Sequence, residues 1–460
     1  MINLFEYQNK ATFEASLEGL EGFLDKIWNN RESKSVYFED ENSEIGPQKF
    51  LHLFHKSSEI KSNKYVGVIH YQGQIINLLP KIFYDSGKDY AEDTEELKND
   101  LSQIHNHVLW WLSYCRKIKF PNYQVAMGGS RSNFFEVLIY LFSKYTREIL
   151  SSSIYQQYEE VNSELTFIKG KLNVNTYLTE NLSKGKWHKI NCTFDAFVLD
   201  NVFNRVIKYV ATLLFNVTSN QENKRNLREI LFLLDEVSEE RVTAEICSKI
   251  TFNPMFSEFE TVRDYCYLFL SNCVSFDYKN DLKLFAFLLP MEYVFEDFIF
   301  GFIDKEIESV KAKSQIRNRF LDEGKVFNLR PDLWLKVGHK ALIADTKYKI
   351  VYSDGKDPKN GISQNDLYQM LAYAVRFEVE ELILFYPETI RDVQDNLSVI
   401  IIKDTLANKE IIIKAFQLPV INRELFKQKL NTKSDLKELF ELTRVKLIDK
   451  IEKILLPQTL

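Results

Sequence analysis

The chain has 460 residues, of which 45% are hydrophobic and 27% charged. This balance is that of a folded globular protein, and it excludes a disordered, collagen-like or disulfide-stapled class. At roughly 150 residues per domain, the length predicts about three domains. The 59 basic and 65 acidic residues give a net charge of −6, so any affinity for nucleic acid must come from a local basic patch.

The cysteine pattern and the hydropathy of the chain indicate its compartment. Five cysteines are scattered without a Cys-x-x-Cys pair, which argues against zinc or iron–sulfur ligation and favours a reduced protein. Glu6 and Glu14 interrupt the start of the chain, which is therefore not expected to be a signal peptide. No apolar run approaches the roughly 20 residues of a membrane-spanning helix. We expect a cytoplasmic protein with no membrane contact.

The first 150 residues combine strand and helix patterns and are expected to form a mixed α+β region. The expected elements are strands at 35–38, 65–71 and 75–78, an acidic loop at 85–100, and helices from residue 101 and over 133–150.

Residues 151–280 have apolar side chains at helical spacing and are expected to be mostly helix. Asp200 is a good N-cap for the first of these helices, since its carboxylate can accept from free backbone N–H groups. The expected helices cover 201–215, 226–234 and 258–270.

From residue 281 the rhythm changes to α-β-β-α-β-β-β with a closing helix, which predicts a mixed α/β domain. The expected elements are a helix at 291–307, strands at 326–337 and 340–348 joined by a tight turn, a polar loop at 353–363, a helix at 364–377, strands at 381–386, 398–403 and 410–416, and an amphipathic helix after residue 422.

Acidic residues lie on both strands of the expected hairpin. Asp332 follows Pro331, which removes a ladder donor and favours a bend or bulge. Asp345 and Lys347 are two residues apart, so they share one face of the second strand. Two carboxylates can bind Mg²⁺ through oxygen, and the metal can polarise a phosphodiester and activate water. The lysine would offset charge that develops on the phosphate. The alternative is a salt bridge at the end of a strand.

This arrangement resembles the PD-(D/E)xK nucleases, with Asp332 on one strand and Asp345 and Lys347 on the next. Gln369 and Tyr373, one turn apart on the following helix, resemble the QxxxY helix of the RecB-like branch. Glu296 resembles the acidic residue that the first helix of such nucleases often contributes. The resemblance assigns all six residues to the catalytic site and Asp332 and Asp345 to the metal. Gln369 and Tyr373 could alternatively serve core packing.

More of the chain, from about residue 65 to 390, is similar to McrC, the endonuclease subunit of McrBC-type modification-dependent restriction systems. The similar segments are 65–69, 78–82, 169–172, 200–204, 294–296, 329–332, 345–349 and 366–373. The resemblance implies a Mg²⁺-dependent endonuclease that cuts double-stranded DNA together with a McrB-like AAA+ GTPase hexamer. No phosphate-binding G-x-x-x-x-G-K-[ST] motif occurs, so GTP is expected only on the partner.

The resemblance also implies a division of labour in a multi-domain α/β protein. Residues 1–150 would bind the partner and stimulate its GTPase, residues 151–280 would form a helical middle, and residues 281–460 would form the PD-(D/E)xK restriction-endonuclease-like core. Two alternatives stay open: a non-catalytic activator that keeps the nuclease fold as a scaffold, and a stand-alone RecB-like repair nuclease. The complete set of Asp332, Asp345 and Lys347 argues against the first, and the McrC-like N-terminal two-thirds argues against the second.

Local charge is compatible with DNA contact. Between residues 311 and 349, ten Lys and Arg face four Asp and Glu, which gives +6 in a chain of net charge −6. Basic residues that replace condensed counterions give affinity for DNA of any sequence. The alternative is a solvated basic face. The ten basic residues are Lys311, Lys313, Arg317, Arg319, Lys325, Arg330, Lys336, Lys340, Lys347 and Lys349.

Overall fold

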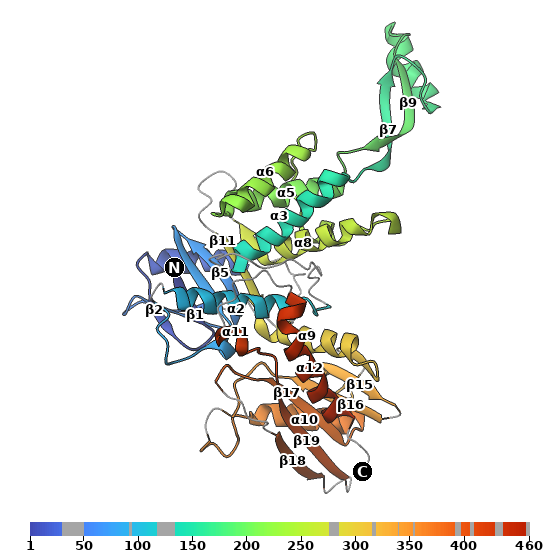
Figure 1. Cartoon of the computed structure of the whole chain (residues 1–460). Coiled ribbons are helices and arrows are strands. Elements are labelled where there is room, and N and C mark those ends of the chain that lie inside the picture. The colour runs from blue at the N-terminus through green and yellow to red at the C-terminus, as the bar shows by residue number, and fades with distance from the viewer. Residues whose placement is uncertain are drawn as a thin grey trace. The chain divides into compact units, whose positions relative to one another are not determined.

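The computed structural model describes residues 1–29, 50–91, 94–116, 134–275, 285–314, 319–338, 340–352, 355–391, 397–404, 409–427 and 436–456. The strand expected at 35–38 lies outside these residues. The fold is mixed α/β and multi-domain, with two compact units (Figure 1). One unit joins Met1–Leu138 with Ser271–Leu460, and the other is Ile139–Leu270. The three functional ranges drawn from the sequence stay a prediction.

The N-terminal part of the first unit is built on a five-stranded sheet of order β1-β6-β5-β11-β10. The hairpin of β5 and β6 confirms the strands expected at 65–71 and 75–78. The third neighbour, β11, was not expected, because it arrives from beyond residue 280 and pairs antiparallel with β5. The strands are β1 (Ile2–Phe5), β6 (Gln74–Leu79), β5 (Tyr65–Tyr71), β11 (Phe285–Pro290) and β10 (Cys273–Ser275).

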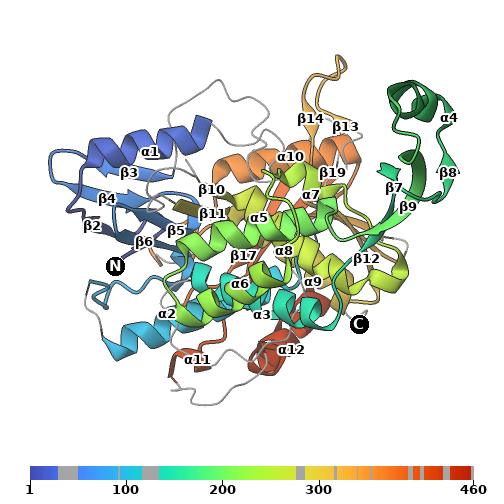
Figure 2. The ribbon, with the colours of Figure 1, turned by 90° about the horizontal axis from the view of Figure 1, so that it is seen from above.

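Gly67 allows β11 to approach β5 closely. Its φ is +145°, and a Cβ atom there would lie 1.9 Å from the Phe287 carbonyl oxygen. Only glycine fits this backbone contact. Helix α1 (Leu17–Asn29) covers a small sheet of order β2-β4-β3 (Figure 2), and together they bury a core that reaches Tyr65 and Ile69. These strands are β2 (Lys10–Thr12), β4 (Glu59–Ser62) and β3 (Leu51–Phe54).

The C-terminal part of the same unit is a six-stranded sheet of order β12-β15-β16-β17-β19-β18. Strands β16, β17 and β19 run parallel, and the other pairs are antiparallel. Parallel neighbours need a crossover, which α10 (Gln364–Phe377) supplies between β16 and β17. The strands are β12 (Val310–Ser314), β15 (Leu333–Val337), β16 (Lys340–Thr346), β17 (Glu381–Pro387), β19 (Lys409–Leu418) and β18 (Leu397–Asp404).

The sequence-based expectations for this sheet are confirmed in order, with two differences. The expected strand 326–337 is divided, because Pro331 interrupts the ladder between β14 (Asn328–Leu329) and β15. β14 pairs instead with β13 (Arg319–Phe320), and the edge strand β12 was not expected. Helices α2 (Glu95–Leu112), α9 (Met291–Glu306) and α12 (Leu436–Leu455) share one aromatic core, in which the Trp110 and Phe440 rings stack with centroids 4.8 Å apart.

The second unit is helical apart from an arm, residues 157–198, within the range 151–280 that was expected to be mostly helix. This expectation was wrong: β7 and β9 pair along nine residues each, and β8 adds to β9. Figure 1 shows the arm reaching away from the helices of its own unit. The arm consists of β7 (Gln157–Leu165), β8 (Lys171–Leu172), short helical turns over 174–184, and β9 (Ile190–Val198). The main helices are α3 (Phe134–Ser152), α5 (Val202–Val217), α6 (Gln221–Leu233) and α8 (Glu258–Asn272).

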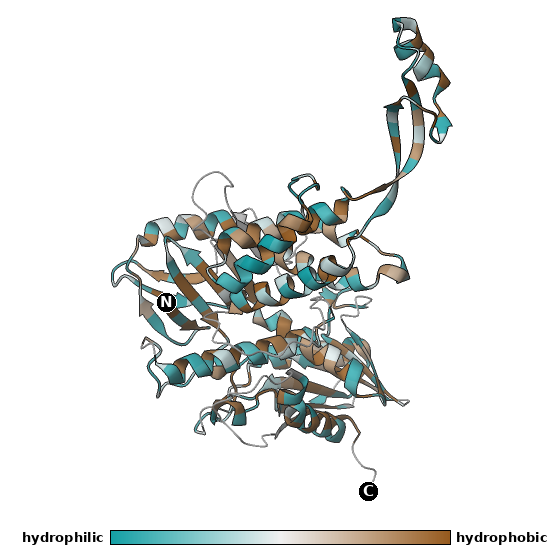
Figure 3. Cartoon of the chain, turned by 45° about the horizontal axis from the view of Figure 1, so that its top comes forward, coloured by the Kyte–Doolittle hydropathy of each residue, from teal (hydrophilic) through white to brown (hydrophobic). Residues whose placement is uncertain are grey.

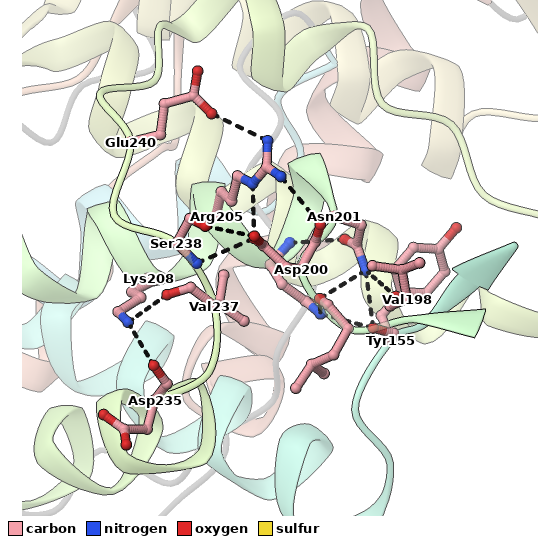
Figure 4. Close-up of polar contacts among 12 residues, drawn as sticks. Tyr155, Val198, Asp200, Asn201, Arg205, Lys208, Asp235, Val237, Ser238 and Glu240 are labelled. Carbon is pink, nitrogen blue, oxygen red and sulfur yellow. Dashed lines mark hydrogen bonds and ion pairs between the residues drawn. The ribbon is translucent and has the colours of Figure 1, made fainter. Parts of the chain in front are cut away.

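Two asparagines tie together the ends of the arm (Figure 4). Asn201 caps α5 by accepting from the Asn204 N–H at 3.0 Å, and its amide donates to the carbonyls of Tyr155 and Val198. Asn204 donates to the Tyr155 and Leu199 carbonyls, both at 2.7 Å. Because Tyr155 precedes β7 and Val198 ends β9, these bonds hold the entry and exit of the arm together.

Asp200 is not the helix cap that the sequence suggested. Its carboxylate accepts from Arg205 Nε at 2.8 Å and from the Ser238 backbone N–H at 3.1 Å. The guanidinium and the serine hydroxyl lower the pKa of Asp200 to about 2. Asp200 therefore fixes the loop after α6, while Asn201 performs the capping.

None of the helices in the described ranges combines the length and the hydrophobicity that crossing a membrane requires.

Candidate active site

The end of strand β16 carries a buried carboxylate and a lysine. The Asp345 side chain is fully buried, and the Lys347 ammonium forms an ion pair with its carboxylate. Asp345 alternates with Ile343, which belongs to the same buried cluster as Met370 and Tyr373 of α10. Because successive strand residues point to opposite faces, Asp345 and Lys347 both face α10.

Asp332, in the bend just before β15, closes the site from the other side. Its backbone N–H donates to Asp345 Oδ1 at 3.4 Å. Its Oδ2 accepts from the backbone N–H and the hydroxyl of Thr346, at 2.7 and 2.8 Å. The Asp332 side chain thus binds the end of β16 where Pro331 interrupts the ladder. The bend expected after Pro331 brings two carboxyl groups together.

Helix α10 continues the network. Gln369 Oε1 accepts from Lys347 Nζ at 2.9 Å, and Gln369 Nε2 donates to the Tyr373 hydroxyl at 2.7 Å. The Tyr373 hydroxyl donates to the Arg330 carbonyl at 2.9 Å. A continuous chain of hydrogen bonds therefore runs from the lysine to the residue before Pro331. Tyr373, 2% exposed, is part of both this chain and the core.

Glu296, on α9, is 8% exposed, and its charge acts on Asp332. The pKa of Asp332 is raised well above its ordinary value. Burial is the largest cause, and the charges of Asp345 and Glu296 add to it. The structure thus brings all six residues predicted from the sequence into one neighbourhood.

Several carboxylates are gathered around one lysine at this site. Burial raises the pKa of Asp345, against the opposing effect of Lys347. Burial disfavours the charged form of Lys347, yet the Asp345 and Asp332 carboxylates outweigh it and raise the pKa of the ammonium. The site therefore keeps its lysine charged and would gain from further positive charge.

The donor set fits a hard divalent cation. Asp345 Oδ2 is buried, and apart from the Lys347 ion pair it has no regular hydrogen bond within the described residues. No three His, Cys, Asp or Glu side chains of the described ranges converge as metal ligands. Mg²⁺ is commonly held by one or two carboxylates and keeps several waters, so two aspartates suffice.

A second ion pair beside the site was not predicted. Lys349 Nζ donates to both carboxylate oxygens of Asp366, at 2.8 and 2.9 Å, and the Tyr386 hydroxyl donates to the same carboxylate at 3.4 Å. Asp366 is 5% exposed. No strand alternation predicts this pair, because β16 ends at Thr346 and the chain turns between Lys347 and Lys349.

The basic segment divides into paired and exposed lysines. Lys340 pairs with Glu381, on β17. Lys311 and Lys336 are exposed and lie directly opposite each other on β12 and β15, an arrangement that repels without an anion. Lys313 is exposed further along β12. Arg317 lies outside the described residues.

The geometry defines a mixed α/β protein with a carboxylate–lysine site at the end of a parallel strand. Residues 60–387 match the family described as McrBC 5-methylcytosine restriction system component. The chain belongs to this family. No protein among the curated sequences matches it.

Two solved structures are similar to the chain. One is the refined half-complex from a tetradecameric assembly of Thermococcus gammatolerans McrB AAA+ hexamers with bound McrC. The matched chain has a TM-score of 0.64 and 16% identity, with coverage of 98% of this chain and 99% of that chain. The other, a cryo-EM structure of the T. gammatolerans McrBC complex, has a TM-score of 0.48 and 18% identity, with coverage of 66% and 87%. At 16% identity, the first likeness shows a shared fold.

Proposed function

We propose that this chain is the McrC-type subunit of a GTP-driven restriction system, a Mg²⁺-dependent endonuclease with a PD-(D/E)xK core that cuts double-stranded DNA. In this proposal it acts in the cytoplasm and stimulates a McrB-like AAA+ GTPase hexamer that alone binds GTP. The observation that carries the proposal is the hydrogen-bonded set of Asp332, Asp345, Lys347 and Gln369 at the end of β16.

The chemistry follows from the positions of these groups. Asp332 and Asp345 would hold Mg²⁺, which when bound polarises a phosphodiester and lowers the pKa of bound water. The Lys347 ammonium would offset the charge that develops on the phosphate. Gln369 fixes the ammonium, and the Tyr373 hydroxyl fixes Gln369. Glu296 adds negative charge on the Asp332 side.

The DNA backbone would contact the exposed lysines of β12 and β15. Phosphates would relieve the repulsion between Lys311 and Lys336. Such contacts carry no sequence information, which suits a nuclease that is delivered to its site by a partner.

The arm is our candidate for the contact with the partner. Its tip exposes large apolar side chains, with Phe167, Ile168 and Trp187 60%, 64% and 71% exposed. Figure 3 shows brown, hydrophobic stretches interspersed with teal, hydrophilic ones along the arm. Exposed apolar side chains in such number are typical of a protein-binding surface. The T. gammatolerans structure contains McrC bound to McrB hexamers, which supports a partner of the same class here.

The test is cleavage of a plasmid that carries 5-methylcytosine, with GTP, Mg²⁺ and the partner GTPase. Asp345→Ala removes a metal ligand and Lys347→Ala removes the charge at the phosphate, so each should lower the rate by at least about 10²–10³-fold. Both should still stimulate GTP hydrolysis. Glu410→Ala, an exposed residue near the start of β19, is the control and should cut normally. Normal cutting by Asp345→Ala would refute the site, and a wild-type chain that stimulates without cutting would support the scaffold alternative.

A further inference from the structure

Tyr348 follows Lys347 and points to the opposite face of the strand end. The Lys347 N–H makes the last ladder bond, to the Phe385 carbonyl at 2.8 Å, and the Lys349 N–H then donates to the Lys347 carbonyl at 2.8 Å. This tight turn places Tyr348 between the two lysines. Both lysines reach carboxylates of the site, Asp345 and Asp366, whereas the Tyr348 side chain is 3% exposed on the other side.

The environment of Tyr348 comes partly from the N-terminal sheet. The Lys81 ammonium lies 4.6 Å from the centroid of the Tyr348 ring and 5.6 Å from that of Tyr7. Phe295, next to Glu296 on α9, packs against the same ring with centroids 5.8 Å apart. Lys81 is only 9% exposed, and a cation over an aromatic ring attracts more strongly when water is excluded.

Lys81 is itself held firmly by its own sheet. It begins the short turn (Lys81–Phe83) after β6, and its backbone N–H donates to Glu6 Oε2 at 3.2 Å. The Glu6 N–H in turn donates to the Leu79 carbonyl at 3.0 Å. The next residue, Ile82, makes a second link to the C-terminal part of the chain. Its carbonyl accepts from the N–H of Ile390, which lies beyond β17, at 2.9 Å. The N-terminal sheet thus contacts the segments that follow both β16 and β17.

We propose that Lys81 and Tyr348 are positioning residues for DNA cleavage, which hold the end of β16 so that Lys347 stays aligned with Asp345 and Gln369. The inference rests on the proposed nuclease function. It means that the N-terminal sheet, besides any contact with a partner, completes the support of the nuclease site. Neither residue touches the reacting phosphate in this scheme, since Tyr348 lies on the face away from α10.

The experiment uses the full chain with its partner GTPase and measures single-turnover cleavage of 5-methylcytosine plasmid at saturating Mg²⁺. Lys81→Ala should lower the cleavage rate constant by about 10–100-fold, the usual effect of losing a supporting group. DNA affinity and GTPase stimulation should be unchanged, because we place the DNA contact on β12 and β15 and the partner contact on the arm. Lys81→Arg keeps a cation over the ring and should recover most of the rate. Tyr348→Phe keeps the ring and should behave likewise, whereas Tyr348→Leu should resemble Lys81→Ala.

Lys208→Ala is the matched control. Lys208 is 8% exposed and donates to the Asp235 and Val237 carbonyls in the other unit (Figure 4). It should lower thermal stability with no change in cleavage per folded molecule. If Lys81→Ala fails to fold, Lys81→Met tests the charge with the chain length kept.

Three outcomes decide between the possibilities. Wild-type cutting by Lys81→Ala or Lys81→Met overturns the inference. A loss that merely follows the folded fraction, as for Lys208→Ala, also overturns it and assigns Lys81 to stability alone. If Asp345→Ala also cuts normally in the same assay, the proposed function itself fails, whatever the Lys81 variants do.

Discussion

Gln369 occupies the middle of the hydrogen-bond chain from Lys347 to the Arg330 carbonyl. Gln369→Ala should free the Lys347 ammonium to adopt other positions and slow cleavage by about 10–100-fold at saturating Mg²⁺. Thermal stability should change little, because Gln369 is partly exposed. Gln364→Ala, at the exposed start of the same helix, is the control and should change neither the cleavage rate nor the thermal stability. A Gln369→Ala chain with a lowered melting temperature and full specific activity would mean that the residue serves packing only.

Glu6 should make the stability of the protein depend on pH. Burial raises its pKa from 4.5 to about 7, although Lys81 opposes the shift, with Glu292 and Tyr348 also facing the carboxyl group. A raised pKa in the folded state stabilises the fold below about pH 4.5, and this contribution is lost as the pH rises through about 7. The difference between these two pKa values corresponds to about 3 kcal/mol.

The free energy of unfolding of Glu6→Gln should therefore increase relative to that of the wild type as the pH rises from 5 to 8. The expected increase is on the order of 3 kcal/mol. Urea unfolding at intervals across that range measures the difference. Glu95→Gln, at an exposed helix start, should follow the wild-type profile. Profiles of Glu6→Gln and wild type that run parallel would show that Glu6 does not bind the additional proton.

Local periodicity predicted two pairs of site residues, and the resemblance to the PD-(D/E)xK nucleases predicted that these pairs meet Asp332 and Glu296. Strand alternation puts Asp345 and Lys347 on one face, and a helical turn does the same for Gln369 and Tyr373. The contact of Lys81 with Tyr348 was not predictable, since its partners are distant in the chain and only tertiary packing joins them. The catalytic roles of these residues stay predictions.

Among the elements, the arm is where sequence-based reasoning failed. A strand is recognised by alternating apolar and polar residues, which arises when one face is buried. Most of β9 is partly or fully exposed, and β7 carries glutamates, asparagine and serine among its apolar residues. The arm is held together instead by the backbone hydrogen bonds between β7 and β9. These bonds require no alternation of apolar and polar residues in the sequence.

The arm can be shortened without disturbing its base. Leu165 and Ile190 are directly opposite, so an Asn-Gly dipeptide in place of residues 166–189 would close a two-residue hairpin. The Asn201 and Asn204 bonds to the base would remain. We expect this variant to fold but to lose stimulation of the partner GTPase, because the exposed apolar tip is gone.

GTP hydrolysis by the partner, measured with an equimolar amount of the variant chain, tests the shortened arm. Phe167→Asp should weaken stimulation in the full-length arm. Phe232→Asp is the matched control, since Phe232 is 80% exposed on α6 of the same unit. Full stimulation by the shortened chain would assign the partner contact to another surface.

At the scale of the whole molecule, segments that are distant in the sequence belong to the same sheet. β11 follows the helical unit in sequence but completes the N-terminal sheet beside β5. A chain that ends at residue 280 would lack β11 and leave the buried strand β5 with an open edge. We therefore expect that cutting the chain between the helical and α/β rhythms damages the N-terminal sheet and does not separate two functions.

The unit Ile139–Leu270 offers a better separation, because its first and last helices pack together. The Phe142 ring of α3 lies 5.6 Å from that of Phe269 in α8, and the Tyr145 hydroxyl donates to the Glu258 carbonyl at 3.3 Å. A segment whose ends meet can be excised as a piece. Residues 134–272, which keep both helices whole, should fold alone, stimulate the partner GTPase through the arm, and cut no DNA.

Circular dichroism melting and GTPase assays of this piece, beside residues 1–280, test the expectation. The piece 134–272 should melt cooperatively, whereas 1–280 should aggregate or melt early because β5 is uncovered. A folded 134–272 that does not stimulate the GTPase would move the partner contact to the other unit. The shortened arm within 134–272 is the control, because it should fold equally well and stimulate nothing.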